Sequence, residues 1–426
     1  MPEQYMDFKG EYHMKVKAVR LYGKEDMRFE EFDLPEIQED EILAKVVTDS
    51  LCMSSYKAML QGSDHRAIPD DIDETPIIMG HELCGEIVQV GKKLEGKYQV
   101  GDQFAVQPKM YFGDEIAAPG YSYPMYGGNM TYTIIPAEVI EGGYVLPYSG
   151  DAFYKASMAE PISCIVSAFR ATYHLAPNHK DHIMGLKAGG SLVILAGCGP
   201  MGLGAAEVAM AMEPRPSRIV LTDIDAARVA RAKALLKSKN GVTVEVIDTS
   251  GVEDVPALLT KDGGFDDVLI MAPVPSVIET ADAIAGEDCC INFFAGPTQK
   301  DFYVKVNFYD VHYNYKHIIG TSGGDVEDMK EALHLIETNA IDASVLVSHI
   351  GGLSAAAEAT LNLPSIPGAK KLIYCGVDMP LTAIDDFVEM GKQNPLFAEL
   401  HEICARHNML WSREAEAYLL ENTKVI

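Results

Sequence analysis

The sequence has few basic residues, no long apolar run and no cysteines paired as CxxC. Its 426 residues include 35 lysines and arginines against 62 aspartates and glutamates, for a formal net charge of −27. Such a surface repels nucleic acid and anionic lipid headgroups. No run of about 18 apolar residues is present to span a bilayer, and residues 1–15 lack the apolar core of a secretory signal. We therefore predict a protein that binds neither nucleic acid nor membrane.

The cysteines do not form a disulfide framework. They are scattered along the chain at positions 52, 84, 164, 198, 289, 290, 375 and 404. In a long chain this spacing is typical of a reducing compartment, where most such thiols are small buried apolar side chains. The pattern predicts a cytoplasmic protein in which any special cysteine is a metal ligand or a nucleophile.

Two regions of different character follow one another, and the length also predicts two domains. From residue 14 to about 150, short apolar runs alternate with glycine, proline and acidic turns, which predicts a β-rich region without helical periodicity. From about residue 166, strand candidates such as 191–197 and 218–224 alternate with helix candidates such as 226–237. This alternation predicts an α/β fold with a doubly wound parallel sheet.

A glycine-rich turn marks a candidate dinucleotide site. Gly197, Gly199 and Gly202 form a GxGxxG pattern between a predicted strand and a predicted helix. The first glycine allows the tight turn, the second lets the backbone approach a pyrophosphate, and the third lets helix and strand pack closely. We predict that the pyrophosphate binds at Gly197, Gly199, Pro200, Met201 and Gly202, where the helix begins. The alternative is a glycine-rich turn in an α/β protein that binds no nucleotide.

The next predicted strand ends at an acidic residue, Asp223, about 20 residues after Gly202. A carboxylate there accepts hydrogen bonds from the ribose hydroxyls of NAD(H) and repels the 2′-phosphate of NADP(H). Arg228, a short way further on, supplies a positive charge that would favour a 2′-phosphate. The pattern therefore favours NAD(H) and leaves NADP(H) possible.

Three separate segments offer side chains that bind zinc. Cys52 lies in DSLCMSSYK, His81 and Glu82 lie in GHE, and Glu160 and Cys164 lie in AEPISC. Zinc accepts sulfur, nitrogen and oxygen ligands, and a catalytic zinc uses three protein ligands and one open position. Cys52 and His81 with either Glu160 or Cys164 supply such a set. Glu82 is a candidate for a further ligand or for a carboxylate that supports the ligands from behind.

Together with TPIIM, VGDQFAVQP, GGNMTYTIIP and GCGPMG, these segments resemble the zinc-dependent medium-chain alcohol and polyol dehydrogenases, from about residue 14 to 378. The resemblance implies a β-rich, partly closed barrel-like catalytic domain built from residues 14–165 and 324–378. It places a dinucleotide-binding Rossmann domain at 166–323, and a helical C-terminal extension follows at 379–426. It also implies hydride transfer with a nicotinamide cofactor, in a homo-oligomer that is a dimer or a tetramer.

The same resemblance bears on individual residues of the metal site. Polyol dehydrogenases have a glutamate at the position matching Glu160, whereas alcohol dehydrogenases have a cysteine at the position matching Cys164; the EP dipeptide favours Glu160. Ser54 matches the family's proton-relay hydroxyl. Lys57 stands where relatives often carry a relay histidine, and it is a proton shuttle, a contact for a substrate phosphate or a solvated surface lysine. The predicted catalytic residues are Cys52, Ser54, Lys57, His81, Glu82 and Glu160.

A second zinc is not expected. Many alcohol dehydrogenases hold a structural zinc on four closely spaced cysteines, and residues 109–130 of this chain contain none. We predict one zinc per chain, with this lobe held by packing of its tyrosines and prolines.

Further segments, such as APGYSY, LPYSGDAFY and SCIVSAF, resemble the L-sorbose 1-phosphate reductase subfamily. That resemblance implies conversion between a ketose phosphate and a polyol phosphate, L-sorbose 1-phosphate and D-glucitol 6-phosphate. Three alternatives stay open. One is a dehydrogenase of unphosphorylated polyols or secondary alcohols, such as sorbitol or a butanediol. Another is an amino-alcohol dehydrogenase of the threonine type, and the last is a nicotinamide-binding sensor without catalysis, which would predict damaged ligand residues.

Overall fold

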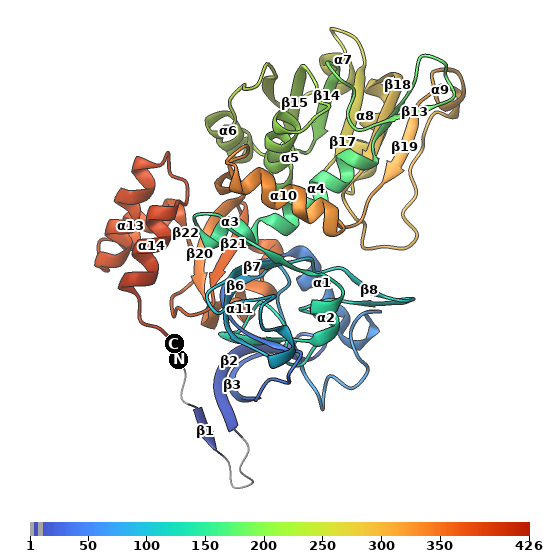
Figure 1. Cartoon of the computed structure of the whole chain (residues 1–426). Coiled ribbons are helices and arrows are strands. Elements are labelled where there is room, and N and C mark those ends of the chain that lie inside the picture. The colour runs from blue at the N-terminus through green and yellow to red at the C-terminus, as the bar shows by residue number, and fades with distance from the viewer. Residues whose placement is uncertain (1–3, 7–11) are drawn as a thin grey trace. The chain divides into compact units, whose positions relative to one another are not determined.

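The computed structural model describes residues 4–6 and 12–426, which form two compact units (Figure 1). The first unit holds the described residues up to Glu160 and then Val347–Ile426, and the second holds Pro161–Leu346. The expected boundary at residue 324 differs from this division, because 324–346 packs within the second unit. Arg170 pairs there with Asp328 at 2.9 Å.

The first unit is built mostly on antiparallel strands, and one pair, Val347–Gly352 with Lys370–Tyr374, is parallel. A smaller sheet contains β1 (Gln4–Met6), β2 (Tyr12–Gly23), β3 (Asp26–Pro35) and β5 (Ile77–Ile78). A larger sheet runs β11 (Val145–Pro147), β7 (Gln103–Val106), β6 (Cys84–Val90), β4 (Ile42–Leu51), β21 (Lys370–Tyr374), β20 (Val347–Gly352) and β22 (Thr382–Ala383), with β10 (Tyr132–Ile135) also on β4. A hairpin of β8 (Met110–Phe112) and β9 (Glu115–Ala117) stands apart. The central strand β4 is buried along almost its whole length, and it pairs with β21 so that Thr48 faces Tyr374.

Short helices connect these strands. They are α1 (Met53–Gln61), α2 (Ala137–Glu141), α3 (Phe153–Ser157) and α11 (Ala356–Leu361), with 3-10 turns at Gly62–Asp64, Lys92–Leu94, Leu353–Ala355, Leu363–Ser365 and Ile384–Asp386. The sequence shows no helical periodicity of any length in this region, yet the structure has the short helices α1 and α2 there. Helix α1 has only nine residues, three of them buried, so its periodicity is too short to stand out in the sequence.

The C-terminal stretch of the first unit is helical. It contains α12 (Phe387–Met390), α13 (Pro395–Arg406) and α14 (Arg413–Asn422), and Figure 1 shows α13 beside α14. The sequence encodes both long helices at their starts: the side chain of Asn394 caps α13, Pro395 follows it, and Ser412 caps α14. The ring of Phe387 packs on those of Phe397 and Trp411.

The second unit is a parallel sheet with helices. Its strands are β14 (Ser191–Leu195), β15 (Arg218–Asp223), β16 (Thr243–Asp248), β17 (Phe265–Ile270), β18 (Ala285–Phe293) and β19 (His317–Gly320). Its helices are α4 (Ala159–Ala171, which begins in the first unit), α5 (Pro200–Ala211), α6 (Ala226–Leu235), α7 (Val255–Leu259), α8 (Pro275–Ile284), α9 (Phe308–Tyr313) and α10 (Val326–Glu337), with a 3-10 turn at Ala343–Leu346. The strand order β16-β15-β14-β17-β18-β19 is that of a doubly wound dinucleotide-binding fold. The predicted α/β class is confirmed.

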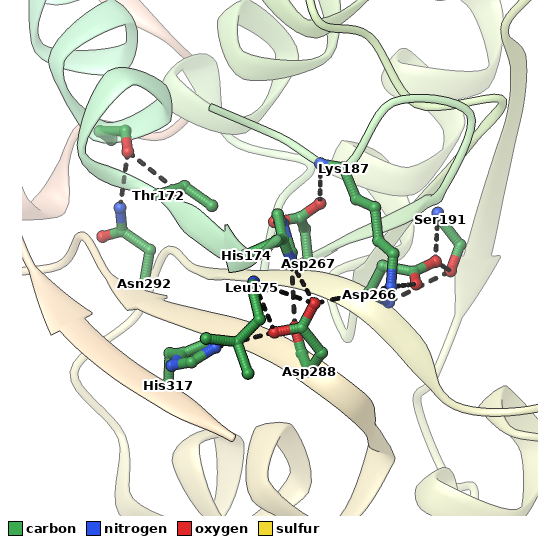
Figure 2. A network of polar contacts seen from close by, with 11 residues as sticks. Thr172, His174, Leu175, Lys187, Ser191, Asp266, Asp267, Asp288, Asn292 and His317 are labelled. Atoms are coloured by element: carbon green, nitrogen blue, oxygen red, sulfur yellow. Dashed lines mark hydrogen bonds and ion pairs between the residues drawn. The ribbon is translucent and has the colours of Figure 1, made fainter. Parts of the chain in front are cut away.

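A polar network joins the hairpin β12 (Tyr173–Leu175) and β13 (His182–Met184) to this sheet (Figure 2). His174 Nδ1 lies 2.9 Å from the carbonyl oxygen of Asp288, and Nε2 lies 3.0 Å from the Asp267 carboxylate. Burial disfavours the imidazolium, but the hydrogen bond to Asp267 and the proximity of Asp288 raise the pKa of His174. When the His174 ring is charged, each of its two nitrogens donates a hydrogen bond to one of these acceptors. Asp267 lies on β17 and Asp288 on β18, so His174 attaches the hairpin to both strands.

In the described part of the chain, no helix is long and apolar enough to cross a membrane.

Candidate metal and dinucleotide sites

Cys52 lies where strand β4 gives way to helix α1. It occupies the N-cap position, with extended backbone angles of −118° and 145°, and the N–H groups of Ser55 and Tyr56 donate to its carbonyl oxygen. The Cys52 side chain is therefore held at the N-terminus of helix α1.

The GHE segment lies in the short connection between β5 and β6. Gly80 has a φ of +91°, and a Cβ there would meet Asp49 Oδ2 at 2.5 Å, so only glycine fits. The carboxylate of Asp49 accepts a hydrogen bond from the backbone N–H of Glu82 at 2.9 Å and one from the Asn129 amide at 2.6 Å. Burial raises the pKa of Asp49 to about 7, although the nearby His81 and these hydrogen bonds lower it. This buried carboxyl thus fixes the loop that presents His81 and Glu82.

The structure brings three of the predicted ligands together. One ligand atom each from Cys52, His81 and Glu82 lies within 4.8 Å of the others, and no other group of three such residues occurs among the described residues. Ser54 donates a hydrogen bond to the Cys52 sulfur at 2.9 Å and lies 3.3 Å from His81 Nε2. The Ser55 hydroxyl lies 3.2 Å from His81 Nδ1. That contact leaves Nε2 as the nitrogen turned toward the cysteine, as in a zinc-binding histidine oriented by a partner at its other nitrogen.

Glu82 has partners for both of its carboxylate oxygens. Lys370 on β21 donates to one oxygen and the Ser50 hydroxyl donates to the other. The side chains of Glu82 and Lys370 are 0% and 8% exposed, so this ion pair is buried. Burial disfavours the ammonium, but the Glu82 carboxylate, the Cys52 thiol and the Glu160 carboxylate together raise the pKa of Lys370. Lys370 therefore supplies the positive charge that balances the acidic groups around the site.

Glu160 lies in the first turn of α4 and is half-buried. It is outside the group of mutually close ligand atoms, but its charge acts on Glu82, Tyr121 and Lys370. The carboxylate therefore contributes negative charge to the surroundings of Glu82 and Lys370. Cys164 lies one turn further along α4, in the second unit.

Tyr121 closes one side of the cluster. Its ring lies 5.5 Å from that of His81 and 5.1 Å from that of His65. Burial, the Cys52 thiol and nearby carboxylates raise the pKa of Tyr121, and its hydrogen bond with Ser54 lowers it. The two hydroxyls of Ser54 and Tyr121 thus form a continuous chain beside the ligands. Lys57 lies in the middle of the same helix as Ser54 and is half-buried.

The lobe at 109–130 is held by aromatic packing. The Tyr144 hydroxyl accepts from the backbone N–H of Tyr111 and donates to its carbonyl oxygen, and the Tyr144 ring packs edge-on against Phe112. Tyr123 and Tyr126 pack against each other in the same way.

The glycine-rich turn of the second unit has the features that a pyrophosphate site needs. Gly199 is the N-cap of α5, and Pro200 is the first residue of that helix. A Cβ at Gly202 would collide with the carbonyl oxygen of Gly197, whereas a Cβ at Gly199 would meet nothing within 4 Å. Gly202 therefore permits close packing, and Gly199 faces open space where the backbone can approach a ligand. Met201 follows in the first turn of the helix.

Asp223 ends β15 beside this turn. Its carboxylate accepts hydrogen bonds from the backbone N–H groups of Cys198 at 3.2 Å, Ile224 at 2.8 Å and Asp225 at 3.1 Å. The residue is 6% exposed, so it orders the turn from within the loop. Arg228 lies on α6 with its Nε 3.9 Å from Asp225, and its side chain is half exposed.

The residues around Cys52 fit the zinc ion that the sequence suggests, and those around Gly199 fit the suggested dinucleotide. Sulfur, imidazole and carboxylate donors around one point, with a hydroxyl behind the imidazole, suit zinc. A glycine turn at a helix N-terminus with an acidic residue at the next strand end suits a nicotinamide dinucleotide.

Comparison with known proteins agrees with this geometry. The alcohol dehydrogenase GroES-like domain matches residues 38–142, and the zinc-binding dehydrogenase domain matches residues 200–338. Mannitol-1-phosphate 5-dehydrogenase of Aliivibrio fischeri is 46% identical over 96% of this chain and 98% of its own. L-Sorbose 1-phosphate reductase of Klebsiella pneumoniae is 43% identical over the same shares. The chain belongs to the zinc-dependent medium-chain polyol dehydrogenases.

This dehydrogenase is therefore an oxidoreductase that acts on CH–OH groups with zinc and a nicotinamide cofactor, which confirms the predicted family and enzyme class. Among solved structures, 2R,3R-butanediol dehydrogenase from Bacillus subtilis has a TM-score of 0.70 at 23% identity. It covers 84% of this chain and 99% of its own, and the likeness shows the same fold.

Four residues around the candidate metal site were not predicted from the sequence. Asp49, Ser55, Tyr121 and Lys370 became visible only when the fold brought them to Cys52, His81 and Glu82. Lys370 lies 288 residues from Glu82 in the chain. The one usable hint was Lys370 and Lys371 at the start of an otherwise apolar strand, where a buried lysine needs an acidic partner.

Proposed function

We propose that this dehydrogenase interconverts a ketose phosphate and a polyol phosphate, with L-sorbose 1-phosphate and D-glucitol 6-phosphate as the leading pair. Two relatives that match 96% of the chain support a phosphorylated substrate. One is an L-sorbose 1-phosphate reductase and the other is a mannitol-1-phosphate 5-dehydrogenase. The second name makes mannitol 1-phosphate the runner-up. The matched structure named for butanediol, an unphosphorylated alcohol, is much less similar, at 23% identity.

For the metal, we propose a single zinc held by Cys52, His81 and Glu160. Glu82 is close enough to be a ligand, but its two oxygens are already bound by Ser50 and Lys370. We therefore assign Glu82 the supporting role and keep Cys164 as the alternative to Glu160. When bound, zinc supplies Lewis-acid polarisation of the reacting oxygen, and the nicotinamide supplies or accepts the hydride.

The chain's own residues handle the proton. Ser54 lies beside both Cys52 and His81, so its hydroxyl is placed to exchange a proton with a substrate oxygen at the metal site. The Ser54 hydroxyl also forms a hydrogen bond with Tyr121, which extends the proton path by one group. Lys57, one turn further along α1, is proposed either to continue this path or to bind the substrate phosphate.

For the cofactor, we propose NAD(H), bound at Gly197, Gly199, Pro200, Met201 and Gly202. Asp223 carries the preference, because a carboxylate at the end of β15 repels a 2′-phosphate. Arg228 would soften that preference, but its charge lies next to Asp225. A homodimer or homotetramer is the proposed assembly.

A substrate panel tests the proposed function. Steady-state kinetics with D-glucitol 6-phosphate, mannitol 1-phosphate, sorbitol, 2,3-butanediol and L-threonine, each with NAD and NADP, should show the highest kcat/KM for D-glucitol 6-phosphate with NAD. Each charge-assisted hydrogen bond to phosphate contributes about 1.5–3 kcal/mol, so two such bonds predict at least about a 100-fold preference over sorbitol.

The matched comparison is that between D-glucitol 6-phosphate and sorbitol, which differ only by the phosphate. Equal or faster turnover of sorbitol would rule out a phosphorylated substrate. Threonine as the preferred substrate would replace the proposal with an amino-alcohol dehydrogenase.

A further inference from the structure

The C-terminal helices reach the segment that carries Glu160 through one buried carboxylate. Glu416, on α14, is 4% exposed. Its oxygens accept hydrogen bonds from the backbone N–H groups of Phe153 at 2.7 Å and Tyr154 at 2.8 Å. These are the first two residues of α3, whose own N-cap residue is Ala152, with no side chain able to cap the helix. Glu416 thus satisfies N–H groups that the local sequence leaves without a partner.

The same carboxylate also holds strand β21. The Tyr374 hydroxyl donates to Glu416 at 2.8 Å and accepts from Trp411 Nε1 at 2.7 Å. Tyr374 is the last residue of β21, and Lys370, the partner of Glu82, is the first. The three hydrogen bonds that Glu416 accepts therefore fix α14 to α3 and to β21.

Strand β4, which leads to Cys52, joins this arrangement through Thr48. The Thr48 hydroxyl donates to the carbonyl oxygen of Phe153 at 3.2 Å and lies 2.6 Å from the Ser157 hydroxyl. Thr48 also pairs with Tyr374 across the sheet. The segments that lead to Cys52, to Glu160 and to Lys370 consequently meet around Glu416.

We propose that Glu416 is a positioning residue for the metal site: by capping α3 and holding β21, the C-terminal extension sets where Glu160 and Lys370 lie. Glu160 follows α3 after only Met158 and Ala159, so a shift of α3 moves it directly. This inference rests on the proposed zinc site and gives a function to the residues after 378. Without the cap, Glu160 would be less well placed, and zinc would bind more weakly.

The zinc affinity of the full-length protein tests the positioning role of Glu416. It is measured by competition with a chelator, at a temperature where circular dichroism shows that every variant is folded. The d–d absorption of the cobalt-substituted protein gives a second readout that reports on ligand geometry. We expect Glu416→Ala to raise the zinc dissociation constant about tenfold, the lower end of the effect of removing a residue that supports metal ligands, and to shift the cobalt bands. Glu416→Gln keeps one acceptor oxygen and should lie between wild type and Glu416→Ala, so it decides the matter if the alanine variant does not fold.

One control separates positioning from general stability. Leu400→Ala removes a buried side chain of α13 but leaves the hydrogen bonds of Glu416 in place, so it should lower the melting temperature and keep the zinc dissociation constant within about twofold of wild type. Tyr374→Phe removes the hydrogen bond that joins β21 to Glu416 and leaves the α3 cap, so it should raise the zinc dissociation constant less than Glu416→Ala does. If the Glu416 variants lose stability but bind zinc as Leu400→Ala does, the positioning role is overturned while the zinc site stands. If wild-type protein itself binds no zinc, the proposed function fails as well.

Discussion

Replacing Cys52 by alanine is expected to remove zinc and almost all activity while leaving the chain folded. Cys52 supplies the only sulfur in the group of ligand atoms at the site. Without zinc, the reaction loses several kcal/mol of charge stabilisation at the reacting oxygen. At about 1.4 kcal/mol per tenfold change, kcat/KM should fall by about a thousandfold or more. Zinc content by elemental analysis and kcat/KM with the best substrate of the panel are the measurements.

Cys404→Ala is the matched control for this variant. Cys404 is also a free cysteine, but it is fully buried and lies on α13 among the C-terminal helices. That variant should keep one zinc per chain and near wild-type activity, since only packing changes. A Cys52→Ala protein that retained both zinc and activity would remove Cys52 from the metal site.

Replacing Lys370 by methionine is expected to have the largest effect on stability. The substitution leaves the Glu82 carboxylate buried beside Cys52 and Glu160 without its balancing charge. Breaking a buried ion pair from one side typically costs about 3–5 kcal/mol of unfolding free energy. Denaturant titrations of the wild type and the variant, both without added metal, measure this cost.

An exposed ion pair supplies the control for Lys370. Lys392 pairs with Glu389, and their side chains are 64% and 71% exposed, so Lys392→Met should cost less than about 1 kcal/mol. The double variant Glu82→Gln with Lys370→Met should recover part of the lost stability, because no buried charge then remains unpaired. Equal, small effects of Lys370→Met and Lys392→Met would show that the buried pair contributes little.

The second unit was the more predictable part of the fold. Its strands are short, continuous apolar runs, and observed bounds such as Ser191–Leu195 and Arg218–Asp223 lie within two residues of the predicted ranges. The GxGxxG pattern lies between β14 and α5, as predicted. Local periodicity and glycine spacing are sufficient there because each strand pairs with others of the same kind.

The first unit was less predictable because its contacts join distant segments. The short helix α1, which carries Ser54 and Lys57, has too few turns to give a clear pattern. Strand β21 pairs with β4 across more than half of the chain, and nothing in the sequence KKLIY reveals that pairing. The residues named from motifs, Cys52, His81 and Glu82, do meet, whereas their partners required the three-dimensional arrangement.

The EP dipeptide at 160–161 is the sequence feature that favours Glu160 over Cys164 as the third ligand, and the identity of this ligand decides the chemistry of the proposed metal site. X-ray absorption at the zinc edge of the purified enzyme tests it most directly, together with the metal stoichiometry. The account predicts one zinc per chain with a single sulfur ligand at about 2.3 Å and nitrogen or oxygen ligands at about 2.0–2.2 Å. Two sulfur ligands would assign the third position to Cys164, and a zinc without sulfur, or no zinc at all, would contradict the site built on Cys52 and His81.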